Sequence, residues 1–110
     1  MATPLQMHPM SREVVVKIAV QNGRIVLSQD PFYVSKGANE EVKWVAGEGV
    51  EDFLVEFDED SPFYEKQFSS YEPFSGLVRR NVQPNDGKTY KYTVWVDHLP
   101  KLDPTGGVKR

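Results

Sequence analysis

A few side chains in this sequence are of the types that hold metal ions. His98 follows Asp97 near the end of the chain, and residues 58–60 form a dense run of carboxylates. Imidazole and carboxylate groups are common metal ligands in proteins. The run lacks the alternating Asp-x-Asp-x-Asp-Gly spacing of a calcium loop and is typical of a solvated turn. The candidate ligands are His98, Asp52, Asp58 and Asp60, and we expect no bound metal and no other cofactor.

The sequence shows no recognisable nucleophilic or acid–base constellation. It contains no cysteine, which excludes disulfides, thiolate metal sites and thiol catalysis. Of its two histidines, His8 stands in a Met-His-Pro-Met segment whose soft ligands suit copper or nickel but whose composition is that of an unstructured start. Gly106-Gly107 lacks the further residues of a phosphate loop. We therefore expect a protein that is not an enzyme.

Composition limits the classes of partner. The chain has 110 residues, of which 39% are hydrophobic and 26% charged, so one soluble domain is expected. Its net charge of −3 argues against nucleic acid as a partner. No apolar run reaches the roughly 18 residues that span a membrane. The start shows no signal peptide, so we expect a cytoplasmic protein, although an exported one that had lost its leader would look the same.

The elements that would position any site are short strands. Alternating apolar residues predict strands over 13–20, 41–45, 53–57 and 89–96. Shorter extended pieces are expected at 24–27 and 32–34 and, less regularly, at 76–82, and residues 102–110 close the fold. Asn22-Gly23 predicts a tight hairpin turn, because both positions of a type I′ turn need a positive φ.

Two further segments complete the expected organisation. Residues 1–11 are predicted to be a flexible tail, and residues 12–110 a single domain. Residues 58–76 are predicted to be a long, aromatic-rich connection that holds one helical turn and is pinned to the core by its rings. About seven strands with regular turns indicate an all-β Greek-key sandwich or barrel.

The order of these pieces resembles a cupredoxin, the β-sandwich of blue-copper proteins. The resemblance is carried by the Val34-Ser-Lys-Gly37 turn, Trp44 in the next strand, the Val55-x-Phe57 strand and, most of all, Gly87-x-x-Tyr-x-Tyr-x-Val94. It extends over roughly residues 13–108. An immunoglobulin-like sandwich is the rival, without the Cys…Trp…Cys pattern to support it.

The same resemblance implies where copper ligands would stand. Family members that bind copper use two histidines, a cysteine and usually a weak axial methionine. Here the first histidine would fall near Asp52 or Phe53, the cysteine at Val94 and the methionine near Leu102. Only the second histidine has a counterpart, His98. The resemblance therefore implies the scaffold without its blue-copper site.

Three functions remain open for such a scaffold. The first is a non-catalytic binding module with a protein or small-ligand partner. Its contact surface would be the loop end around residues 48–53, with Glu51 and Phe53, and around His98. The aromatic connection over 58–76 would lie beside this surface, and alternation places Trp95 on the outer face of its strand. The second is a metal-binding protein with a non-blue His and carboxylate site. The third is a structural subunit that forms homo-oligomers through a sheet edge.

Overall fold

A computed structural model describes residues 12–84 and 88–110 of the chain. Within these residues the protein is all-β, without a helix, and its strands form two sheets. The predicted tail over 1–11, the Met-His-Pro-Met segment and most of the expected 84–87 turn lie outside the described residues. The strands are β1 Arg12–Gln21, β2 Arg24–Leu27, β3 Phe32–Ser35, β4 Glu40–Ala46, β5 Leu54–Phe57, β6 Gln67–Ser69, β7 Tyr90–Trp95 and β8 Thr105–Lys109.

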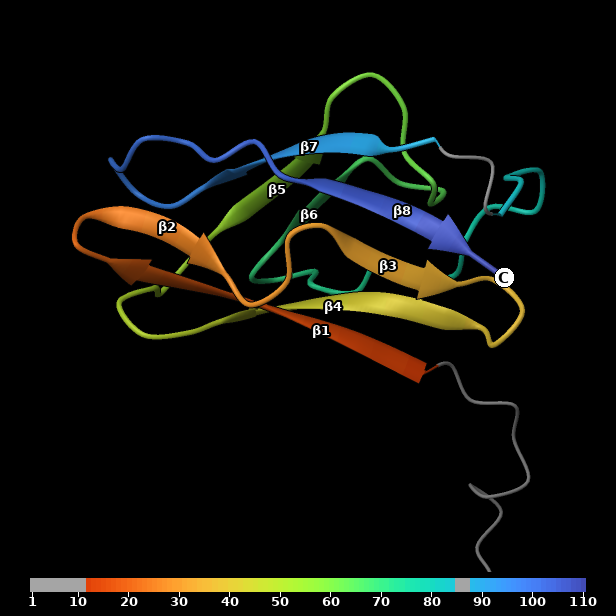
Figure 1. The fold of residues 1–110 in the computed structure, drawn as a ribbon. Coiled ribbons are helices and arrows are strands. Elements are labelled where there is room, and N and C mark those ends of the chain that lie inside the picture. Colours follow the sequence, from red (N-terminus) through yellow and green to blue (C-terminus); the bar gives the residue numbers. More distant parts are fainter. Residues whose placement is uncertain (1–11, 85–87) are drawn as a thin grey trace, which may run out of the picture.

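The two sheets contain three and five strands. Their orders are β2-β1-β4 and β3-β8-β7-β5-β6, so β1 and β7 are interior strands of their sheets. The pairs β1–β4 and β3–β8 are parallel, and the other pairs are antiparallel. Figure 1 shows β3 and β8 running side by side toward the C-terminus, with β1 and β4 paired below them.

The hairpin predicted at Asn22-Gly23 is confirmed. Asn22 has φ of 53° and Gly23 of 74°, and Gln21 pairs with Arg24 across the turn. The alternation predicted for β1 is confirmed as well, because Val16 and Ile18 are fully buried. A positive φ at both turn positions matches the right-handed twist of the flanking strands, which is why this dipeptide fixes the register.

The core between the sheets is built largely from aromatic rings. Trp44 of β4 stacks on Phe68 at a centroid distance of 5.0 Å and meets Phe57 and Tyr92 edge-on. Phe57 and Tyr92 are themselves 5.0 Å apart. These rings come from both sheets, so their contacts bury apolar area and join the two layers at once.

Two glycines let β8 pack closely against β3. A Cβ on Gly106 would lie only 2.1 Å from the ring of Phe32, which is fully buried. A Cβ on Gly107 would lie 3.0 Å from the ring of Tyr33, which lies on the opposite face and is half exposed. The glycine pair thus has a packing role at the β3–β8 seam.

Two local expectations were wrong, and the closing segment 102–110 contains a strand that the sequence had not specified. Residues 58–76 contain no helical turn but a short strand, β6, which pairs with β5. Residues 76–82 form no strand, and their only ladder contact is an isolated bridge between Val78 and Phe63. Residues 105–109 are a full strand, which brings the number of strands in the described residues to eight. Strands β6 and β8 form because each pairs with strands that are distant in the sequence.

The aromatic connection is pinned to the core only in part. Phe63 and Phe68 are buried, as the expectation required, whereas Tyr64, Tyr71 and Phe74 are exposed. The described residues contain no helix long and apolar enough to cross a membrane.

Candidate functional site

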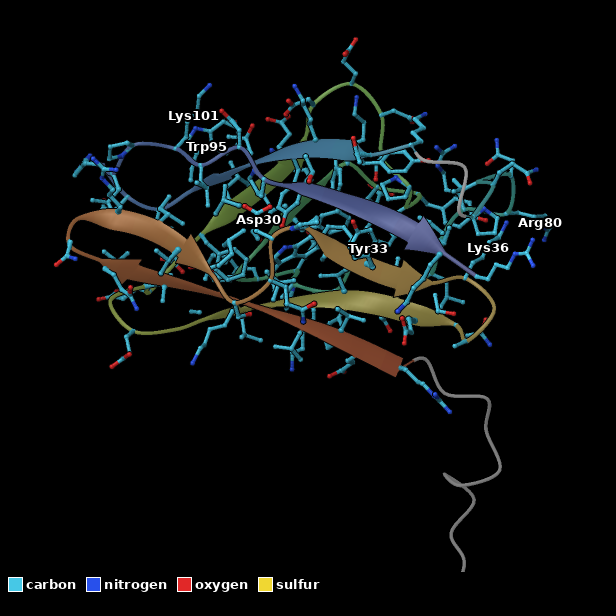
Figure 2. All side chains as sticks on the ribbon, viewed as in Figure 1. Asp30, Tyr33, Lys36, Arg80, Trp95 and Lys101 are labelled. Atoms are coloured by element: carbon cyan, nitrogen blue, oxygen red, sulfur yellow. The ribbon has the colours of Figure 1, made fainter. Side chains whose placement is uncertain are left out.

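Strand pairing brings the predicted interaction residues to one end of the sandwich. β5 and β7 are antiparallel neighbours, and Leu54 lies opposite Trp95. The segment before β5, with Glu51 and Phe53, therefore meets the segment after β7, with Asp97. Trp95 is half-buried and lies on the outer face, as the alternation predicted, and Figure 2 shows it at the end of the molecule opposite Lys36 and Arg80.

A first hollow at this end is lined by carboxylates, and we call it the acidic hollow. Its volume is about 300 Å³, and it is lined by Gly49, Glu51, Asp52, Val96 and Asp97. Two backbone bends shape it. Gly49 has φ of 79° and packs on β1, where a Cβ would lie 3.2 Å from the Cβ of Val20. Asp97 has φ of 48°, in the turn closed by the Leu99 N–H donating to the Val96 carbonyl.

A second hollow adjoins the first and is mainly apolar, and we call it the aromatic hollow. Its volume is about 280 Å³. Asp52 and Asp97 line it as they line the acidic hollow, so the two hollows share a wall. Its lining is Asp52, Phe53, Leu54, Ser69, Ser70, Tyr71, Trp95 and Asp97.

Hydrogen bonds fix the turn that carries Tyr71. The hydroxyl of Ser69 accepts hydrogen bonds from the backbone N–H groups of Tyr71 and Glu72. Ser70 donates its N–H to the Phe53 carbonyl at 3.2 Å and its hydroxyl to Asp52 Oδ1 at 2.9 Å. Tyr71 is 82% exposed, yet it stands on a turn bonded to the segment that carries Asp52. The turn that carries Tyr71 is therefore fixed both by the Ser69 hydroxyl and by its hydrogen bonds to the segment with Asp52 and Phe53.

The carboxylates of the two hollows have little charge compensation. Among the described residues, Glu51 and Asp52 form no ion pair, and neither lysine nor arginine lines either hollow. Asp97 has one partner, the imidazole of His98 at 3.5 Å, which carries charge only when protonated. The site therefore presents negative charge directly beside two aromatic rings.

His98 lines neither hollow. Its side chain is 98% exposed, and its one ionic contact is with Asp97. The structure thus brings together three of the four predicted interaction residues, Glu51, Phe53 and Trp95, and places the fourth on the rim.

Of the four predicted metal ligands, only Asp58 and Asp60 line one hollow, which also contains Lys88 and Lys91, and the four do not converge on one point. Asp52 precedes β5 and Asp58 follows it, so the length of the strand separates them. Asp58 accepts a hydrogen bond from the hydroxyl of Thr93, which lies at similar distance from Asp103. Within the described ranges, 12–84 and 88–110, no group of three or more His, Asp or Glu side chains is arranged to hold a metal ion.

Asp60 is engaged in ion pairs. Its carboxylate contacts Lys88 at 2.8 Å and Arg79 at 3.1 Å. The hydrogen bond from Lys88 is the main cause that lowers the pKa of Asp60 below its ordinary value of 3.8. Such an exposed pair contributes about 0.2–1 kcal/mol to stability. Both positive neighbours would compete with a cation at this carboxylate.

The sequence placed the aromatic connection over 58–76 beside the contact surface but did not single out Tyr71, and Asp97 was not predicted as a contact residue. Tyr71 belongs to the aromatic series of 58–76, but no periodicity separates its exposed ring from the buried Phe68. The usable signal was its flanking residues, Ser69-Ser70 before it and Glu72-Pro73 after it, which are turn formers. Asp97 was considered only as a neighbour of His98, because its contribution depends on the backbone bend after β7.

Comparison with known proteins adds no relative to this description. No family model matches the chain, no curated protein matches it, and no solved structure matches it.

Proposed function

We propose that this protein is a non-catalytic binding module that holds its ligand in the acidic and aromatic hollows. The observation that carries the proposal is the convergence of Glu51, Phe53 and Trp95 on two adjoining hollows. Each residue comes from a loop or strand end on a rigid sandwich, which is where such folds usually place their contacts. Hollows of about 300 Å³ are at the small end of ligand sites, so they suit one side chain or a small molecule.

We further propose that the scaffold is a Greek-key, cupredoxin-like sandwich without a copper site. In support, the chain crosses between the two sheets three times, from β2 to β3, from β3 to β4 and from β4 to β5. At two of the positions that the resemblance assigns to copper ligands, the side chains are aliphatic. Val94 is fully buried and bridges Leu102 through the backbone, so this pair packs where a thiolate and a thioether would stand.

For the sheet-edge alternative, two stretches of the three-stranded sheet are already covered: the part of β1 before its pairing with β2, and the outer side of β4. Beside β1, Ser28 bonds the backbone of Lys17, and the Gln29 amide donates to the Val15 carbonyl. Beside β4, the Trp44 N–H donates to the Pro73 carbonyl. Side chains and loops that occupy the edge groups reduce the opportunity for another strand to pair there. The hollows are therefore the better-supported contact surface.

A selection experiment tests the binding function without assuming a ligand. A displayed random-peptide library and a fragment library would be screened against the wild type, Trp95→Ala and a control, Tyr64→Ala. Tyr64 is an exposed aromatic residue that lines neither hollow. We expect ligands enriched by the wild type to be retained by the control and lost by Trp95→Ala. Ligands that bind all three proteins equally, or an absence of ligands, would contradict the proposal.

A further inference from the structure

The two hollows share two lining residues whose charge determines which ligands can bind. Asp52 and Asp97 line both, while Trp95 and Tyr71 line the aromatic hollow only. A ligand group lying against the ring of Trp95 is therefore next to two carboxylates. Beyond them, Glu51 lines the acidic hollow. A ligand of this surface must therefore contact an apolar ring face and also compensate nearby negative charge.

Charge decides among the ligands that stack on aromatic rings. Anions are disfavoured because no lysine or arginine lines either hollow. A neutral ring such as a sugar can stack on tryptophan, but it leaves the charges of Glu51, Asp52 and Asp97 uncompensated. A cation satisfies both features, because cations are attracted to the faces of tryptophan and tyrosine and to carboxylates.

We propose that the paired hollows bind an arginine side chain presented by an extended peptide of a partner protein. This inference rests on the binding function proposed above and names its ligand class. A guanidinium group is planar, stacks on an aromatic face and carries a fork of N–H donors that matches carboxylate oxygens. In this arrangement it lies over Trp95 and donates to Asp52 and Asp97. Lysine offers a compact point charge without the stacking plane, so it binds more weakly.

The existing hydrogen bonds prepare the site for this ligand. Ser70 donates to Oδ1 of Asp52, which orients that carboxylate and leaves Oδ2 for a ligand. The turn carrying Tyr71 is bonded to the same segment through the Ser70 N–H. Groups that are already held in position lose less conformational entropy when a ligand binds.

Another hollow at the same end supplies a matched control. It is lined by Arg24, Ile25, Pro100, Lys101 and Leu102, and its volume is about 280 Å³. Figure 2 shows Lys101 at the same end of the molecule as Trp95. Lys101→Gln therefore changes the charge of this end without touching the acidic or aromatic hollow. It should leave arginine binding unchanged or slightly tighter.

The test is a titration followed by NMR of the ¹⁵N-labelled full chain. The probes are a blocked Gly-Gly-Arg-Gly-Gly peptide and the same peptide with lysine or citrulline, which is a neutral analogue of arginine. We expect the indole N–H signal of Trp95 to shift saturably with the arginine peptide, while that of the buried Trp44 stays in place. Removing a charge-assisted contact costs about tenfold or more in affinity. The citrulline peptide should therefore bind at least about tenfold more weakly.

Substitutions and the salt dependence of binding then test which residues contact the peptide. Asp52→Asn and Asp97→Asn should each weaken binding of the arginine peptide about tenfold, whereas Lys101→Gln should not. Trp95→Ala, followed through backbone amide signals because it lacks the indole, should weaken binding by a similar factor. Raising the salt concentration from about 0.05 to 0.5 M should weaken binding, because exposed charges are then screened. Unchanged melting temperatures of the variants would show that the fold is intact.

The outcomes separate the ligand class from the binding function. Equal affinity for arginine and citrulline peptides, or no weakening in either aspartate variant, would overturn the arginine proposal. If instead a neutral oligosaccharide or a neutral selected peptide shifts the Trp95 signal, the binding function stands and the ligand class is wrong. If the arginine peptides, the sugars and the selected peptides all leave Trp95 unshifted, both proposals fail.

Discussion

The two tryptophans of this protein show how one residue type serves two regions differently. Trp44 is fully buried and touches the rings of Phe68, Phe57 and Tyr92. Trp95 is half-buried on the outer face of its sheet and lines an open hollow beside Asp52. Both stand on paired strands, and the parity of the position along the strand decides which way each ring points.

The difference teaches which aromatic residues are available for function. The inner rings fill space that no other group fills, so their contribution is to stability. The outer ring lines the aromatic hollow together with Tyr71 and is only half-buried, so another molecule can complete its contacts. Substitutions in the two regions should therefore separate unfolding free energy from binding.

The largest effect is expected from Trp44→Ala. Truncating a buried aromatic side chain costs about 3–5 kcal/mol through lost burial and the cavity left behind. Urea unfolding followed by circular dichroism would measure it. A loss below about 1 kcal/mol would show that the inner ring cluster repacks freely, and the contrast with Trp95 would then disappear.

The glycine pair of β8 offers a matched comparison of the inner and outer faces. Gly106→Ala forces a Cβ into the buried ring of Phe32 and should cost about 1–3 kcal/mol or more. Gly107→Ala meets the half-exposed ring of Tyr33, which can move outward, so its cost should be smaller. Thermal melts of both variants would test this order. Equal losses would contradict the packing explanation for Gly106.

Tyr92 gives the inner region a dependence on alkaline pH. Its hydroxyl and the Trp44 indole N–H are buried without a hydrogen-bond partner in the described structure. Burial raises the pKa of the Tyr92 phenol above its ordinary value of 10.0, the neighbouring Trp44 indole N–H opposes part of this rise although the pair does not meet hydrogen-bond geometry, and the charge of Asp30 adds to the rise. The unfolded chain therefore loses this proton first as the pH rises above 10.

The stability that Tyr92 provides is thus complete below pH 10 and decreases above it by up to about 1.4 kcal/mol per pH unit. Tyr92→Phe should lose this part of the alkaline dependence, as measured by urea unfolding between pH 9 and 11. At neutral pH the variant should be as stable as the wild type or more so, because it removes a buried hydroxyl without a partner. An unchanged alkaline slope would contradict the assignment to Tyr92.

The smallest effect on stability is expected at the outer tryptophan. Trp95→Ala removes a half-buried ring from the surface and should cost less than about 1 kcal/mol in unfolding free energy. The urea midpoint compared with that of Trp44→Ala measures the contrast directly. A loss as large as that of Trp44→Ala would mean that Trp95 is part of the structural core, and its use as a contact residue would be excluded.

Much of the fold was predictable from local patterns. Alternation in 13–20 and 89–96 predicted which side chains are buried, because one face of each strand packs against the opposite sheet. The wrong predictions were at β6 and at 76–82, and β8 lies in a closing segment whose structure was not specified; local pattern is weak in all three places. Gln67–Ser69 becomes a strand because β5 offers its edge, and Thr105–Lys109 becomes one because β3 and β7 flank it.

The candidate site was predictable in its residue types more than in its geometry. Glu51, Phe53 and Trp95 were expected at a contact surface, and they do lie together. Tyr71 was not singled out from its aromatic segment and Asp97 was not predicted, because their places depend on a turn held by Ser69 and on a backbone bend after β7. Neither feature leaves a periodic trace in the sequence.

The sequence by itself determined the all-β class, the Asn22-Gly23 hairpin and the direction in which each tryptophan points. These properties depend on side-chain alternation and on φ preferences, which act between residues close in the chain. Only the tertiary structure decided that Asp52, Tyr71 and Asp97 surround Trp95, and that Asp58 and Asp60 do not. Those distances arise from pairing between β5, β6 and β7, whose residues are up to 41 positions apart in the register that joins Leu54 to Trp95.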